Sequence, residues 1–446
     1  MLVFQAPVAN PGACQAVLPS LNIHSEEGGM RDRLGAFVLS LGAVAASAAL
    51  VVAAAARQTA APASGVTAHE WGTFTSVAGA EGQPVEWAPF TGPQDLPCYV
   101  TQLNPFSVKA ENFVAFNGTQ PGEFLPGLRA SVRMETPVIY FYSPVDAVES
   151  VEVHLPQGLI TEWYPQATVP GVPPWATVAD PRGSGWAKWP SVRIRPDLKT
   201  GFPSDEIASH YYAARDTDSA PLQVGDQVEK FLFYRGLADF PVKLSVRLDR
   251  RGQVAIDRSG APALPAAILF ESDGRRMGFR VLGRVDGGVA IARPELTLDL
   301  QSPALRDELA KTLTAAGLFP REASAMIATW KDSWFEPGVR LFYVLPRESV
   351  DEVLPLTISP APAQLARVFV GRVEIITPEM VTAVASLLRV NDVDALAKYG
   401  RLLDPISNRV LLAMTTRDEQ ARATATLRAV AARFAATRAV TARACQ

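Results

Sequence analysis

The chain has 446 residues, a formal net charge of -3, 20% charged residues and 48% hydrophobic residues. This length provides for two or three ordinary domains with a sizeable core, and the composition is that of a globular protein rather than a disordered one. The chain lacks the basic excess typical of nucleic-acid-binding proteins, so we expect no nucleic acid among its partners.

An uncharged apolar run covers residues 34–56 and follows Arg31 and Arg33. A basic start, an apolar stretch and small residues at its end are typical of a secretory signal peptide. The run is also long enough to span a bilayer, so it is either a cleaved signal peptide or an uncleaved membrane anchor. Both interpretations predict export, to the periplasm or the cell exterior. In the second, residues 34–56 also hold the protein to the inner membrane.

The expected organisation follows from shifts in composition and hydrophobic period along the chain. It comprises a leader or over-called start at residues 1–29, a signal peptide or anchor at 30–57, a linker at 58–68, a β-rich domain at 69–300 that is one sandwich or two packed β units, and an α/β C-terminal domain at 301–446.

Export also changes the expected chemistry of the cysteines, because an exported protein folds in an oxidising compartment. Cys98 and Cys445 both follow the apolar run. Two cysteines in an oxidising compartment can pair in a disulfide. The alternative is a nucleophilic Cys98 activated by a histidine.

Apolar residues alternate with polar ones through the middle of the chain, which predicts β-strands. Within residues 150–155, Val151 and Val153 share one face, whereas Glu152 and His154 share the other. Short strands at about ten-residue spacing favour an antiparallel β-sandwich. The other expected strands are residues 136–142, 159–164, 192–195, 229–234, 241–248, 253–256, 266–270 and 278–282, with an ordered loop at 170–190.

The hydrophobic period changes after residue 301. Leu305, Leu309 and Leu313 recur every four residues, which predicts an amphipathic helix. The fold class is therefore α+β, with an antiparallel β-sandwich-like N-terminal part and a mixed α/β, largely helical C-terminal part. The expected helices are residues 304–316, 320–334, 378–388, 395–414 and 417–443, and the strands are 339–345 and 368–376.

The stretch from His69 to Ser76 is the first dense polar and aromatic sequence after the apolar run. His69 and Glu70 resemble the start of H-E-x-x-H, but Thr73 stands where the second histidine is required, so that zinc helix is excluded. Residues 73–77 suit an opening strand, in which Gly72 allows a close backbone approach.

A histidine metal site is a separate hypothesis. His69, His154 and His210 each have a carboxylate close by in sequence, and three histidines from separate strands can bind Zn²⁺. In that case the protein is an exported, metal-assisted hydrolase that uses His69, Glu70 and His210, with Glu70 as the general base. Histidines with purely structural hydrogen bonds are the commoner alternative.

Aromatic side chains point to binding instead of catalysis. Tryptophans near proline-rich loops can form a platform for an envelope polymer or a protein partner, although core packing is the commoner role of such residues. The tryptophans concerned are Trp163, Trp175, Trp186 and Trp189. Glu135 is a candidate general acid, but pairing with Arg133 or capping of its strand is the commoner role of such a residue. A second local ion pair is expected between Glu336 and Arg340.

Several segments together resemble a group of uncharacterised bacterial exported proteins that open with the motif HEWGTFTS. The matching segments are residues 69–76, 134–142 (METPVIYFY), 159–165 (LITEWYP), 210–215 (HYYAAR) and 333–338 (SWFEPG). The resemblance implies export and a shared fold, and it assigns no activity, cofactor or partner. Binding or structural support in the cell envelope is therefore the first functional hypothesis, and the hydrolase is the second.

Overall fold

The computed structural model describes residues 64–89, 96–102, 129–170, 185–199, 201–206, 209–258 and 260–444. Residues 61–446 form one compact unit. The expected leader and the expected signal peptide or anchor lie outside the described residues. Within the described ranges, no helix combines the length and the apolar character needed to cross a membrane.

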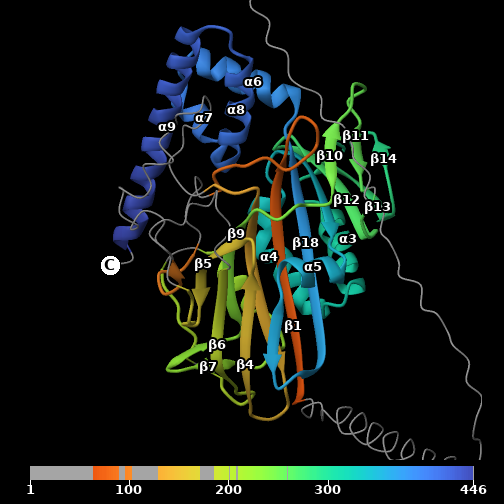
Figure 1. Ribbon diagram of the computed structural model, residues 1–446, viewed down its shortest axis with the longest axis vertical. Helices are drawn as coiled ribbons and strands as arrows, with labels where there is room; N and C mark the ends of the chain where they lie inside the picture. Colours follow the sequence, from red (N-terminus) through yellow and green to blue (C-terminus); the bar gives the residue numbers. More distant parts are fainter. Residues whose placement is uncertain are drawn as a thin grey trace, which may run out of the picture. The chain divides into compact units, whose positions relative to one another are not determined.

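The centre of the protein is a ten-stranded sheet, and its two middle strands come from opposite ends of the described chain (Figure 1). β1 (Ser64–Ala78) pairs in parallel with β18 (Pro362–Ile375) and antiparallel with β3 (Val132–Tyr142). The strand order is β15-β13-β12-β16-β18-β1-β3-β9-β5-β2. The sheet therefore runs across the domain boundary expected at residue 300. Its other strands are β2 (Thr101–Gln102), β5 (Gly158–Tyr164), β9 (Leu232–Ala238), β12 (Leu264–Ser272), β13 (Arg276–Val285), β15 (Leu298–Asp299) and β16 (Gly338–Val344).

Smaller sheets cover one face of the central sheet and make the sandwich. Val151 and Val153 of the five-stranded sheet pack against Ile139 and Phe141 of β3 in a single core, which confirms the predicted alternation. A three-stranded sheet packs beside it in a second core. The five strands are β4 (Ala147–Leu155), β6 (Gly185–Ile194), β7 (Leu222–Val224), β8 (Gln227–Glu229) and β17 (Leu356–Ser359), and the three are β10 (Ser245–Leu248), β11 (Val254–Asp257) and β14 (Val289–Ile291).

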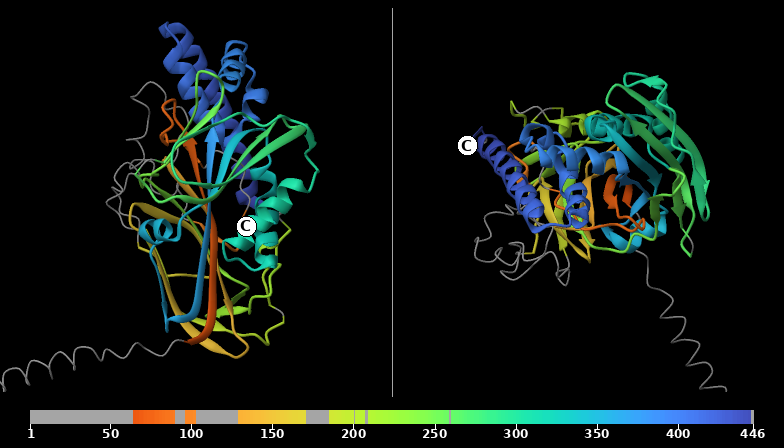
Figure 2. Two further views of the ribbon diagram at one scale, coloured as in Figure 1. Left: turned by 90° about the vertical axis from the view of Figure 1, so that its right-hand side faces the viewer. Right: turned by 90° about the horizontal axis from the view of Figure 1, so that it is seen from above.

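Helices α3 and α4 cover the opposite face (Figure 2), whereas α5 packs in the core of the sandwich side. Leu305 and Leu309 of α3 and Trp334 of α4 pack on Trp71 and Phe342 of the sheet. The C-terminal helices form a further core that includes Val77 of β1. The helices are η2 (His210–Arg215), α3 (Ala304–Ala315), α4 (Pro320–Trp334), α5 (Arg347–Val353), α6 (Pro378–Arg389), α7 (Val393–Ala397), η3 (Gly400–Leu402), α8 (Leu403–Ala413) and α9 (Arg417–Ala444).

Three of the differences from the predicted boundaries have a physical reason in the structure. β1 begins inside the expected linker, because Val66 and Ala68 continue the alternation and are buried. β6 begins inside the expected loop, and its partner strand shifts register near Pro190, which cannot donate to the ladder. The helix expected at 395–414 is broken into α7, η3 and α8 at Gly400, whose φ of 51° is not helical.

Candidate functional site

His69 and Glu70 cannot serve one active site, because neighbouring residues of a strand point to opposite faces of the sheet. His69 lies on the helical face, where its Nδ1 is 2.8 Å from Glu322 Oε2. Glu70 lies on the sandwich face, fully buried, and accepts hydrogen bonds from Tyr234 and Arg367. The prediction that Glu70 acts as a general base beside His69 is therefore wrong, because the two side chains lie on opposite faces of the sheet.

The three histidines of the metal hypothesis have separate carboxylate partners. His69 contacts Glu322, His154 contacts Glu152 at 2.7 Å, and His210 contacts Asp332. Within the ranges that the structure describes, no group of three or more His, Cys, Asp or Glu side chains is arranged to hold a metal ion. The structure therefore does not bring His69, His154 and His210 together.

The four tryptophans also have different surroundings. Trp163 and Trp189 are core residues, 5% and 0% exposed, which contradicts their expected role in a binding platform. Successive side chains of a strand point to opposite faces, and Trp163 and Trp189 both lie on the face that points into the core. Trp186 is half-buried on the outer face of β6, and Trp175 lies outside the described residues.

Cys98 is disulfide-bonded, so it has no thiolate with which to act as a nucleophile. The other two cysteines of the chain, Cys14 and Cys445, lie outside the described residues.

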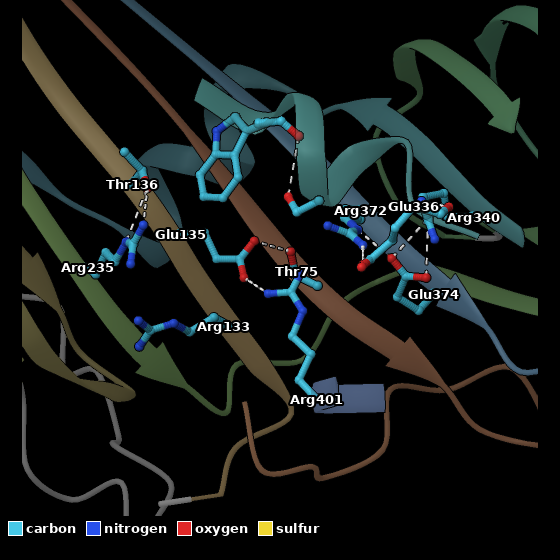
Figure 3. A network of polar contacts seen from close by, with 12 residues as sticks. Thr75, Arg133, Glu135, Thr136, Arg235, Glu336, Arg340, Arg372, Glu374 and Arg401 are labelled. Atoms are coloured by element: carbon cyan, nitrogen blue, oxygen red, sulfur yellow. Dashed lines mark hydrogen bonds and ion pairs between the residues drawn. The ribbon is translucent and has the colours of Figure 1, made fainter. Parts of the chain in front are cut away.

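Segments that carry the family resemblance meet instead in a buried polar network on the helical face of the central sheet (Figure 3). Residues 69–76 contribute Thr75, residues 134–142 contribute Glu135 and Thr136, and residues 333–338 contribute Glu336. We call this network the Glu135 cluster. Its members are Thr75, Arg133, Glu135, Thr136, Arg235, Glu336, Arg340, Arg372, Glu374 and Arg401.

A β-bulge brings Glu135 into the cluster. On β1, Trp71 faces Val138 and Thr73 faces Glu135, so two residues of β3 lie opposite the single Gly72. The extra residue keeps Glu135 on the helical face. Thr136, in the bulge, has a φ of 46°, which is strained for a β-branched residue. Its hydroxyl accepts hydrogen bonds from Arg235 Nε and Nη2 at 3.1 and 3.0 Å.

Gly72 is required opposite this bulge. A Cβ at position 72 would lie 2.7 Å from the ring of Phe369 and 3.1 Å from the Cα of Pro137. The expected close backbone approach at Gly72 is therefore confirmed.

The partners of Glu135 differ from those predicted. Glu135 accepts hydrogen bonds from Arg401 and, at 2.8 Å, from Thr75. The expected partner, Arg133, donates instead to Glu162 at 2.8 Å. Sequence proximity suggested Arg133, but Arg401 reaches Glu135 from η3, far along the chain.

The second expected pair is also rearranged. The carboxylate of Glu336 accepts from Arg372 Nη2 at 2.8 Å, whereas Arg340 donates to the backbone carbonyl of Glu336, also at 2.8 Å. Arg340 and Arg372 both pair with the buried carboxylate of Glu374. The turn after α4 is thus fixed to β16 and β18 by charged hydrogen bonds.

Electrostatics favour the charged forms of the two buried glutamates. Burial by itself raises the pKa of Glu135, but Arg401 and Arg372 outweigh it and hold the pKa below its usual value. Burial likewise opposes ionisation of Glu374, and Arg340 and Arg372 lower its pKa overall. Both carboxylates are therefore ionised at neutral pH.

These lowered pKa values predict a loss of stability in acid. As pH falls below about 4.5, the unfolded chain takes up protons before Glu135 does, so the stabilisation from Glu135 is complete above that pH and lost below it. We expect Glu135→Gln to cost ~2 kcal/mol at pH 7 and to reduce the acid dependence of stability. Urea unfolding between pH 3 and 7 measures both. The exposed Glu206→Gln is the control, and equal acid dependence in Glu135→Gln and the wild type would contradict the prediction.

The fold and its site define an α+β protein in which a β-sandwich is joined to helices at the C-terminal end, as predicted. No protein-family model matches the chain, and no curated protein matches it. Three chains of known structure match. One is described as "Fcho1 Mu homology domain (Danio Rerio) with bound Eps15 peptide", with 9% identity, a TM-score of 0.26, and coverage of 71% of this chain and 100% of that chain. A structural similarity with so low a TM-score supports no conclusion about the function of this chain.

Proposed function

We propose that the protein is an exported, non-catalytic binding protein of the cell envelope that holds an envelope polymer on the outer face of its five-stranded sheet. The observation that carries this proposal is the half-buried Trp186, which stands on that face among fixed polar side chains. Sugar rings stack on indole faces, and neighbouring charged groups hydrogen-bond their hydroxyls.

The polar side chains around Trp186 are held in place by one another. Trp186 lies opposite His154 in the register of β4 and β6. The carboxylate of Glu152 lies 2.7 Å from His154 Nε2 and 2.9 Å from Lys188 Nζ. The hydrogen bond from Lys188, followed by that from His154, keeps the pKa of Glu152 below its usual value, so the site stays charged at neutral pH. We call Glu152, His154, Trp186 and Lys188 the Trp186 patch.

The placement of the hydrolase candidates supports a binding role over a catalytic one. His69, Glu70 and His210 each contact a different partner, namely Glu322, Arg367 and Asp332, and Glu70 points away from His69. Catalysis by this set requires the three side chains to converge on one reacting group.

Trp186→Ala is expected to reduce retention of the full-length protein on isolated peptidoglycan at least fivefold, because the stacking surface is removed. Sedimentation of the protein with the insoluble polymer measures the bound fraction. Arg193→Ala is the matched control, since Arg193 is an exposed residue of the same strand.

Unchanged retention in Trp186→Ala would remove the polymer proposal. Loss of retention in both variants would show that charge, rather than the Trp186 patch, binds the polymer, and would also count against it.

A further inference from the structure

A cavity of about 160 Å³ lies on the sandwich face of the central sheet, where the segment before β10 and helix α5 contribute to its walls. Neighbouring strands make its floor, because Phe74 of β1 and Tyr343 of β16 are both paired in register with Gly371 of β18. Ser76 follows Phe74 on the same face of β1 and also lines the cavity. Gly371 has no side chain, so the ring of Tyr343 lies close against the backbone of β18.

Arg258 is a buried cation in the wall of this cavity. The residue is 6% exposed, its Nε donates to the carbonyl of Pro262, and its Nη1 donates to the carbonyl of Lys243 at 3.1 Å. Among the described residues, its Nη2 has no hydrogen-bond partner and its guanidinium forms no ion pair. Glu348 is exposed and acts on it only at longer range. Because a buried charge is normally balanced by an opposite charge, Arg258 favours an anion in the cavity.

Two hydroxyl groups line the same cavity. Ser76 and Tyr343 are 3% and 6% exposed, and neither side chain forms a hydrogen bond with another of the described residues. Burial raises the pKa of Tyr343 to about 12, and the charge of Arg258 opposes that rise, so the phenol and the guanidinium lie near each other. Tyr343 therefore stays protonated at neutral pH and can donate to an anion that Arg258 holds.

The rest of the wall is mainly apolar. A cavity of about 150 Å³ with apolar walls is large enough for a benzene ring, so this cavity suits a ligand with a small apolar body. Its larger apolar side chains are Phe74, Phe240, Val242, Leu345 and Val353.

The charges around the cavity favour an anion with one negative charge. Besides Arg258, the charged residues that line it are Lys243 and Glu352, whose side chains pair with each other at 3.3 Å. Both are exposed, so the cavity opens to the solvent beside this pair. A guanidinium matches the two oxygens of a carboxylate, whereas the second charge of a phosphate would stay unpaired among apolar walls.

We propose that this cavity, which we call the Arg258 cavity, binds a small monocarboxylate whose apolar body is the size of a benzene ring. Its carboxylate contacts the guanidinium of Arg258 and the hydroxyl of Tyr343, and its body packs against Phe74 and Phe240. The Trp186 patch lies on the outer face of the five-stranded sheet, so the two sites are separate and this one does not depend on polymer binding.

Isothermal titration calorimetry of the full-length protein with benzoate tests this proposal. We expect saturable binding of one benzoate per chain and no binding of benzamide, the neutral analogue. Arg258→Lys keeps the charge but removes the planar guanidinium, and it should weaken benzoate binding at least tenfold. Arg247→Lys is the matched control, because Arg247 is an exposed arginine of β10 that does not line the cavity, and it should bind benzoate like the wild type.

Tyr343→Phe is a second variant that retains the shape of the ring. It removes a hydroxyl with no partner among the described residues, so the benzoate-free protein should unfold at the same temperature as the wild type or higher, while benzoate binding weakens severalfold. Absence of saturable benzoate binding, or equal binding of benzamide, would overturn the carboxylate assignment. Wild-type affinity in both Arg258→Lys and Tyr343→Phe would overturn the site.

Discussion

Replacing Glu70 by alanine is expected to lower the free energy of unfolding by about 3–5 kcal/mol, because it leaves the buried guanidinium of Arg367 without its main counter-charge. Arg367 is 5% exposed, and its Nε donates to the fully buried Glu70. Its other nitrogens donate to Asp351 and to the carbonyl of Leu354, both at 2.6 Å. The ion pair thus joins β1 to β18, and Arg367 joins β18 to α5. Urea denaturation of the full-length protein measures the loss.

Two further variants separate this structural role from a catalytic one. The double change Glu70→Leu with Arg367→Met removes both charges and should recover much of the stability lost in Glu70→Ala, because a buried ion pair can be replaced by apolar side chains of similar size. A Glu70→Ala protein within 1 kcal/mol of the wild type would show that the ion pair does not hold these strands together.

Gly371→Ala is expected to destabilise the protein by ~3 kcal/mol, at the upper end of the range for overpacked cores. A Cβ at position 371 of β18 would lie 2.0 Å from Cζ and 2.2 Å from Cε1 of Tyr343, which is far closer than van der Waals contact. Tyr343 is 6% exposed and packs in the core beneath the three-stranded sheet. The ring has to leave its position or the two strands have to separate, and thermal unfolding reports either outcome.

A matched control and a rescue distinguish a clash from a general effect of alanine. Gly65→Ala places its Cβ in open space and should change stability by less than about 0.5 kcal/mol. In a Tyr343→Ala background, Gly371→Ala should cost much less than in the wild type. Additive effects of the two changes would contradict the proposed contact.

Local patterns predicted much of the fold. Alternation located β4 and the β10–β11 and β12–β13 hairpins, and the four-residue spacing of leucines located α3. These elements depend on neighbours in the sequence, which a single sequence displays. The parallel pairing of β1 with β18 depends on long-range packing, and no local pattern distinguishes it from antiparallel pairing.

The site was harder to predict, because its residues come from six separate elements. One signal was present: Arg372 and Glu374 follow Val368 and Val370 on the same face of β18, so charged side chains occupy positions that alternation assigns to the core. Such inward charges predict buried ion pairs. The bulge that places Glu135 in the cluster contains Thr136, which has a positive φ. Threonine rarely adopts a positive φ, so the sequence does not predict a bulge at this position.

The pairing of β1 with β18 also has a consequence for the order in which the protein folds. Glu70 and Arg367 are 297 residues apart, yet they lie side by side at the middle of the sheet. During synthesis, β1 has one unpaired edge until nearly the whole chain has left the ribosome, and such an edge invites association with other chains. Contacts between distant residues also slow folding. We therefore expect the sheet to close late, and the segments before and after residue 300 to be insoluble when produced separately.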